Sequence, residues 1–155
     1  MSHIGDPVQE CEFEISPYIC TISGTIRATV YEVGGTHPTG IIRTDQAWYV
    51  EVEWSLEGPL VHHLCGEFCV CLHLECFGPG PEYTLPDPCP RIPMDPCGDG
   101  QYSYRINIPA GTIDPKVCGN VCCLAVTLTS FDPCGNPGHI AAYCRDLCVM
   151  FYAAT

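Results

Sequence analysis

The chain has 155 residues, of which 46% are hydrophobic, so it is long and apolar enough to fold as one domain around its own core. A small core therefore does not explain its 14 cysteines. The formal net charge is −12 with only six lysine and arginine residues, which argues against nucleic acid or an anionic membrane as the partner. No apolar run reaches the ~18 residues needed to span a membrane.

The start of the chain is expected to be an arm. Residues 1–10 are mostly polar and contain a proline, and residues 11–15 (CEFEI) then alternate like a short strand before Cys20. Such a segment frays in a free monomer unless a neighbouring subunit holds it. We expect residues 1–20 to form an arm or connector with a first short strand, and residues 21–155 to form the main domain.

The rest of the chain alternates apolar and polar residues with a period of two, as strands with one buried and one exposed face do. No ten-residue window carries a convincing helical stripe. The segments predicted as strands are 26–33, 48–56, 68–75, 102–108, 123–129 and 143–152, with glycine- and proline-rich turns between them. This pattern predicts an all-β fold, a single antiparallel β-sandwich of jelly-roll or immunoglobulin-like type.

One segment is rich in proline, with seven prolines between Pro79 and Pro96. We expect residues 78–100 to form a long, stiff surface loop instead of a central strand. The triplet Asp-Pro-Cys occurs at 87–89, 95–97 and 132–134, and glycine follows the last two copies. Aspartate at the first position and proline at the second favour a type I turn, which leaves the cysteine at the exposed third position. Cys89, Cys97 and Cys134 are therefore candidates for disulfides that join two loops or that join the chain to another molecule.

Several cysteines are predicted to point outward from strands. Cys69 and Cys71 share the face opposite the apolar residues of their segment, and Cys123 points outward by the same argument. Cys144 and Cys148 do so if Leu147 and its apolar neighbours at 149 and 151 are the buried set. Residues two apart on a strand have Cα atoms ~6.6–6.8 Å apart, so Cys69 and Cys71 are not expected to bond to each other. Each needs a partner on another strand, another segment or another chain.

Metal binding is an alternative use of the same thiols. Cys65, Cys69, Cys71 and His73 lie close together in sequence, and the Cys-x-Cys pair suits Cu(I), with Zn²⁺ the other candidate. The loops at Asp95/Asp99 and Asp132/Asn136 gather oxygen ligands for Ca²⁺ without matching the full calcium-loop pattern. No catalytic motif stands out among so many thiols, so we expect no enzyme and no required cofactor.

Cysteine content and chain start point to different compartments. An even number of cysteines favours an oxidising setting, whereas the sequence MSHIGDP lacks the basic and apolar regions of a signal peptide. A removed signal peptide, another export route including lysis, or reduced thiols that hold metal would each explain this. We expect a location outside the cell or on a cell or spore surface, and the cytoplasm if the thiols are reduced.

The leading hypothesis is a structural subunit that assembles with itself. Cys11 and Cys20 would be donors from the arm, and outward cysteines of the next subunit the acceptors, in a head-to-tail contact that builds a fibre, appendage or layer. This organisation resembles that of the covalently crosslinked appendages of bacterial endospores, whose β-sandwich subunits carry a cysteine-bearing amino-terminal connector. The resemblance concerns the arm and the strand pattern. Two alternatives stay open: a copper- or zinc-binding module, and a monomeric adhesion or ligand-binding domain stiffened by internal disulfides.

Overall fold

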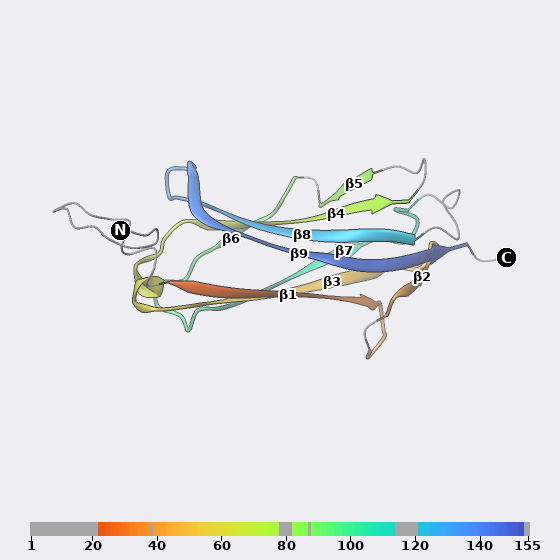
Figure 1. Cartoon of the computed structure of the whole chain (residues 1–155), viewed down its shortest axis with the longest axis horizontal. Helices are drawn as coiled ribbons and strands as arrows, with labels where there is room; N and C mark the ends of the chain where they lie inside the picture. Colours follow the sequence, from red (N-terminus) through yellow and green to blue (C-terminus); the bar gives the residue numbers. More distant parts are fainter. Residues whose placement is uncertain (1–21, 38, 78–81, 87, 114–120, 154–155) are drawn as a thin grey trace, which may run out of the picture.

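The computed structural model describes residues 22–37, 39–77, 82–86, 88–113 and 121–153. This part of the chain is built from strands and one short 3₁₀-helix, and it contains no α-helix, which confirms the all-β prediction (Figure 1). The elements are β1 (Ser23–Glu32), β2 (Ile41–Arg43), β3 (Trp48–Glu57), the 3₁₀-helix η1 (Pro59–His63), β4 (Glu67–Cys76), β5 (Glu82–Leu85), β6 (Arg91–Pro93), β7 (Gln101–Ile108), β8 (Val121–Phe131) and β9 (Pro137–Tyr152). The predicted arm, residues 1–20, lies outside the described residues.

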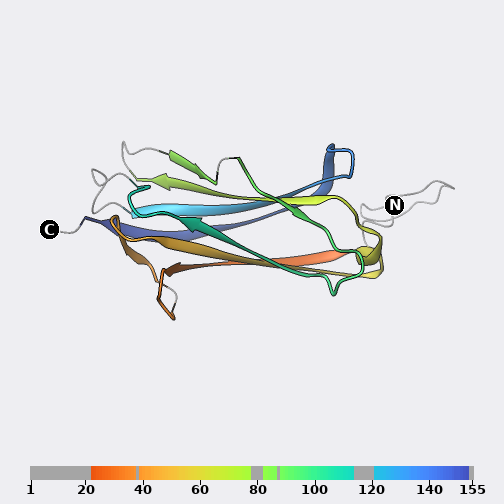
Figure 2. The same ribbon diagram turned by 180° about the vertical axis from the view of Figure 1, so that it is seen from behind.

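The strands form two sheets that lie one above the other along the length of the molecule (Figure 2). One sheet has three strands in the order β1-β3-β7, and the other has the order β2-β9-β8-β4-β5, with β6 also paired to β4. All pairs are antiparallel except β2 with β9, which run parallel. The sheets are thus mostly antiparallel, and the sheet that contains β2 is mixed at its edge, because the chain leaves β1 and crosses to the opposite sheet before it forms β2.

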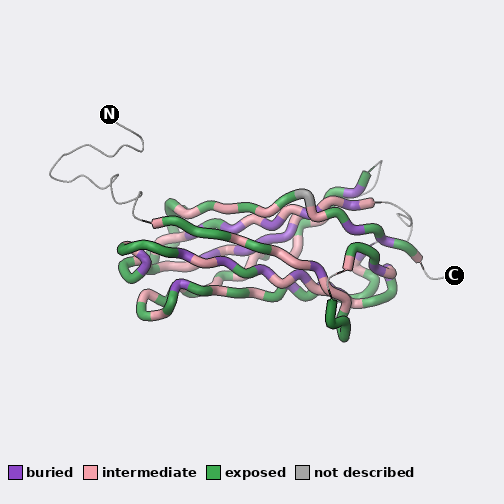
Figure 3. Tube along the Cα trace, turned by 60° about the horizontal axis from the view of Figure 1, so that its bottom comes forward, coloured by how far each residue is buried: buried purple, intermediate pink, exposed green. Residues whose placement is uncertain are grey.

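The core lies between the two sheets and follows from the alternation in the sequence. Along β3, residues 48, 50, 52, 54 and 56 are buried, whereas the residues between them are half-buried or exposed (Figure 3). Rings join the two layers: Trp48 lies 5.4 Å from Phe151, and Trp54 lies 5.3 Å from Phe68, centroid to centroid. Each large side chain buried in this way contributes roughly 1.5–3 kcal/mol to folding.

The proline-rich segment differs from the prediction of one long loop over residues 78–100. It contains two short strands, β5 and β6, that both pair with β4. The segment Glu82–Leu85 has no proline and can pair, and β6 is an edge strand, where proline is tolerated because one side of the backbone needs no ladder partner. The prediction that this segment does not enter the centre of a sheet holds.

Candidate functional site

The outer face of the six-stranded sheet carries the cysteine-rich part of β4. The register places Thr129, Thr127, Ala125 and Cys123 of β8 beside Cys69, Cys71, His73 and Glu75 of β4. Phe68, Val70, Leu72 and Leu74 point the other way and are buried in the core. Cys69 is half-buried, and its burial raises the pKa of its thiol, an effect that the nearby Arg91 partly offsets. Cys69 and Cys71 therefore share the outer face, as the alternation predicts.

Cys71 is bonded within the chain. It forms a disulfide with Cys89, one of the predicted loop cysteines, with a Cα–Cα distance of 5.6 Å. The bond ties the proline-rich segment down over β4, which leaves Cys71 only 4% exposed although it lies on the outer face. Cys71 and Cys89 are thus a structural pair within one chain.

A second disulfide joins Cys76 to Cys122, two cysteines that our sequence reasoning did not select. They are directly opposite in the register of β4 and β8, with Cα atoms 3.8 Å apart, and both are buried. The sequence indicates that both cysteines point inward. Cys76 is an even number of residues from the core residues of β4, and Cys122 is an even number of residues from the core residues of β8. The register that brings them together is set by tertiary packing.

Cys144 does not lie on the outer face, so that expectation is wrong. Leu147 and Val149 do belong to the inward set, but β9 has one extra residue between the pairs Leu124–Leu147 and Val126–Cys144. Such a β-bulge reverses the alternation beyond it. Cys144 consequently packs against the core, and its thiol donates a hydrogen bond to the carbonyl oxygen of Ile26 on β1, with the sulfur 3.5 Å from that oxygen.

The exposed cysteines lie near both ends of the molecule. Cys97 and Cys134 occupy the predicted Asp-Pro-Cys turns, and the backbone N–H of each donates to the side chain of the turn's aspartate, at 3.1 and 2.9 Å. Cys65 precedes β4, at the same end as the β8–β9 turn, because the first residue of β4 pairs with the last residue of β8. Cys148 lies near the opposite end, on the outer face, where it pairs with Cys123 in the register of β9 and β8. Within the described part of the chain, Cys65, Cys97, Cys134 and Cys148 form no disulfide.

The predicted metal ligands are used differently in the described structure. Cys71 is in a disulfide, and the two ring nitrogens of His73 lie 3.2 Å from the Thr127 hydroxyl and 3.4 Å from the Thr84 hydroxyl. Within the described ranges, no group of three or more histidine, cysteine, aspartate or glutamate side chains could hold a metal ion. The sequence set Cys65, Cys69, Cys71 and His73 is therefore not assembled as a ligand cluster among these residues.

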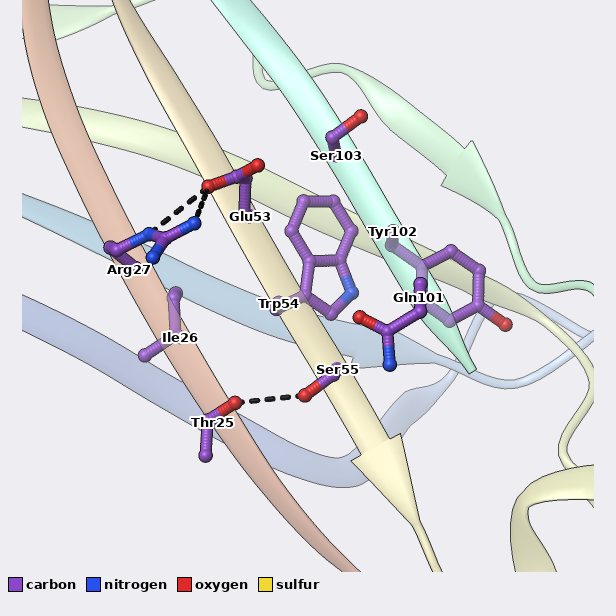
Figure 4. A pocket seen from close by; sticks show the side chains of 9 residues that line it. All are labelled: Thr25, Ile26, Arg27, Glu53, Trp54, Ser55, Gln101, Tyr102 and Ser103. Atoms are coloured by element: carbon purple, nitrogen blue, oxygen red, sulfur yellow. Dashed lines mark hydrogen bonds and ion pairs between the residues drawn. The ribbon is translucent and has the colours of Figure 1, made fainter. Parts of the chain in front are cut away.

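Two hollows border β1. On the outer face of the three-stranded sheet, a polar depression of about 530 Å³ is lined by side chains of β1, β3 and β7 (Figure 4). In it Arg27 pairs with Glu53, and the Thr25 and Ser55 hydroxyls lie 2.8 Å apart. A second, more apolar groove of about 240 Å³ lies between β1 and the first half of β9.

The comparisons do not assign this chain to a family. No protein-family model matches it, and no curated protein matches it in sequence. Among the described residues, no helix is both long and apolar enough to cross a membrane.

Proposed function

We propose that the chain is a structural subunit, a single β-sandwich with an amino-terminal arm, that joins copies of itself through disulfides into an extracellular fibre, appendage or layer. The observation that carries the proposal is the division of the cysteines into two sets. Among the described residues, four cysteines form two disulfides, whereas Cys65, Cys97, Cys134 and Cys148 are exposed and form none.

The two sets suit different tasks. The internal disulfides close segments of 18 and 46 residues, and the second is buried at both cysteines, so they stabilise the subunit itself. Exposed thiols contribute little to folding, and another chain can reach them without any change in the fold. Their position near both ends of an elongated molecule favours crosslinks along its long axis.

The compartment follows from the same chemistry. Disulfides form and persist in oxidising surroundings, and glutathione keeps most cytosolic thiols reduced. The presence of two disulfide pairs supports an oxidising location for the mature protein. We propose that copies are joined when the protein enters such surroundings at the cell or spore surface, and that the protein acts as building material with no enzymatic role.

The proposal is tested by replacing the donor cysteines. The variant Cys11→Ser/Cys20→Ser is expected to lose the covalent multimers that the natural sequence shows on a non-reducing denaturing gel after free thiols are blocked. A matched variant, Cys71→Ser/Cys89→Ser, also lacks two cysteines but should keep the multimers, because its pair bonds within one chain. Unchanged multimers in the first variant would exclude the arm as the donor.

A further inference from the structure

In the described part of the chain, the outer edges of β1 and of most of β9 have no strand partner on one side of the molecule. β1 is an edge strand of the three-stranded sheet, and β9 lies near the edge of the other sheet on the same side. β2 covers the outer edge of β9 only at Met150–Tyr152, so among the described residues Pro137–Val149 have β8 alone as a neighbour strand. β1 has ten residues and contains no proline, lysine or bulge, which are the usual means of protecting a sheet edge. Within the described residues, β1 and most of β9 are therefore strand edges on the same side.

The opening between these two edges is apolar where an added strand would lie. The groove of about 240 Å³ is lined on one wall by Ile22, Ile26 and Leu56 and on the other by Leu128, Ile140 and Ala142. Ile22, Ile26, Ile140 and Ala142 are only half-buried, although they pack against the core. Apolar side chains of an added strand would complete their burial.

The backbone edge of β1 faces the same opening. In an antiparallel edge strand, alternate residues direct both N–H and C=O away from the neighbour strand. Val30 does so, since its carbonyl accepts the N–H of Thr39 at 3.0 Å. Ile26 and Ala28 are four and two residues before Val30, so their backbone N–H and C=O groups also point away from β3. The Cys144 sulfur lies 3.5 Å from the Ile26 carbonyl oxygen and contacts the Ala28 N–H. A thiol is a weak donor and acceptor, so a strand's amides would satisfy these groups better.

The chain itself contains a segment with the matching pattern. In residues 11–15, Cys11, Phe13 and Ile15 share one face and two glutamates share the other. Residues 1–21 precede the rim of the groove, at Ile22. If the segment runs antiparallel to β1 with Cys11 beside Cys144, the next two apolar side chains follow at steps of ~6.8 Å toward Ile22, along the groove.

Charge supports the same orientation. With the apolar face turned into the groove, the two glutamates of residues 11–15 would lie on the outer face of the sheet beside Arg27. The Arg27 side chain is 74% exposed and, among the described residues, pairs with the carboxylate of Glu53. A guanidinium has five N–H donors and can bind a second carboxylate.

We propose that the opening between β1 and β9 binds residues 11–15 of a second copy as an added strand antiparallel to β1, and that Cys11 of that copy forms a disulfide with Cys144. The inference rests on the proposed self-assembly and names its docking site and acceptor thiol.

The covalent step is two thiol–disulfide exchanges with a small disulfide such as oxidised glutathione. The Cys11 thiolate attacks one glutathione sulfur, forms a mixed disulfide and releases one glutathione thiolate. The Cys144 thiolate then attacks the Cys11 sulfur, the Cys11–Cys144 bond forms, and the second glutathione thiolate leaves. Two protein thiols are oxidised, one glutathione disulfide is reduced to two thiols, and the protons of the protein thiols end on glutathione.

The test mixes two variants that each lack one half of the bond. Cys11→Ser keeps the acceptor and is labelled with ¹⁵N; Cys144→Ser keeps the donor and is unlabelled. After oxidation with glutathione disulfide and peptide mapping without reduction, we expect a linked pair of peptides with a light Cys11 half and a heavy Cys144 half. If the natural sequence forms the link and the mixture does not, the arm occupies its own chain's groove, which would overturn the inference.

A second comparison changes residues that lie outside the described structure, so that no packing described above is altered. In the donor copy, Phe13→Asp should slow formation of the Cys11–Cys144 link at least about tenfold, because the groove would receive a carboxylate in place of a ring. Glu12→Gln, on the other face of the segment, should change the rate by less than about threefold. Equal rates for the two variants would contradict docking in the groove. Links from Cys11 of one copy to Cys69 or Cys148 of another, or multimers joined only through other cysteines, would leave the proposed function standing and reject the Cys11–Cys144 bond. The absence of any disulfide between copies would reject both proposals.

Discussion

The two internal disulfides differ in the length of chain that they close, and this predicts different losses of stability. Replacing Cys76 and Cys122 by alanine opens a separation of 46 residues, whereas replacing Cys71 and Cys89 opens one of 18. The loop-closure entropy of the unfolded chain gives about 4 kcal/mol for the first pair and about 3 kcal/mol for the second. The first pair is also buried in the core, so its loss removes packing in addition.

Guanidinium chloride unfolding measures these losses. Trp48 and Trp54 are both 2% exposed, so their fluorescence should report when the core opens. The measurement should be made at about pH 6, where thiol exchange is slow. A Cys97→Ala/Cys134→Ala variant is the control, since it removes two exposed thiols that form no disulfide and should change stability by less than about 0.5 kcal/mol. The reasoning is refuted if the Cys76→Ala/Cys122→Ala variant is as stable as this control, or if it loses less than the Cys71→Ala/Cys89→Ala variant.

Three further predictions concern single residues. Gly66→Ala should cost about 3 kcal/mol or more in chemical unfolding, because its Cβ would lie 2.0 Å from a β8 carbonyl oxygen, whereas Gly111→Ala, with open space, should cost about 1–2 kcal/mol. The pKa of Asp132 is lowered mainly by a hydrogen bond from the backbone N–H of Asn136 and, to a smaller extent, by one from the Asn136 side chain. The ionised Asp132 carboxylate therefore stabilises the folded state at pH values above the ordinary carboxyl pKa, and this stabilisation is lost as the pH falls through the lowered pKa. In the Asp132→Ala variant, the free energy of unfolding should accordingly fall less steeply at acidic pH. Burial raises the pKa of the Cys144 thiol, so iodoacetamide at about pH 8 should alkylate it more slowly than the exposed Cys148; equal rates would show that the groove does not shield it.

The alternation of side chains predicted the parts of the fold that depend on local pattern. The buried faces of β3 and β4 follow directly from a period of two, and the outward placement of Cys69 follows with them. The Asp-Pro-Cys-Gly turns also form as predicted, because the aspartate side chain and proline bias the backbone locally.

The parts that the sequence did not predict depend on how segments meet. One extra residue in β9 reverses the side on which Cys144 lies, and no local feature near residue 144 signals that bulge. The Cys76–Cys122 bond depends on the register between β4 and β8. The parallel contact of β2 with β9 involves three residues per strand, too few for a periodicity to be seen.

The most direct test of the central claim is the intact mass of native protein, denatured without reductant after all free thiols are blocked. Disulfide-linked self-assembly predicts a series of covalent multimers that collapse to a single chain on reduction. Each chain should also carry two disulfides that resist mild reductant, those at 71–89 and 76–122. A population of single chains before reduction, with Cys65, Cys97, Cys134 and Cys148 all blocked as free thiols, would contradict the claim.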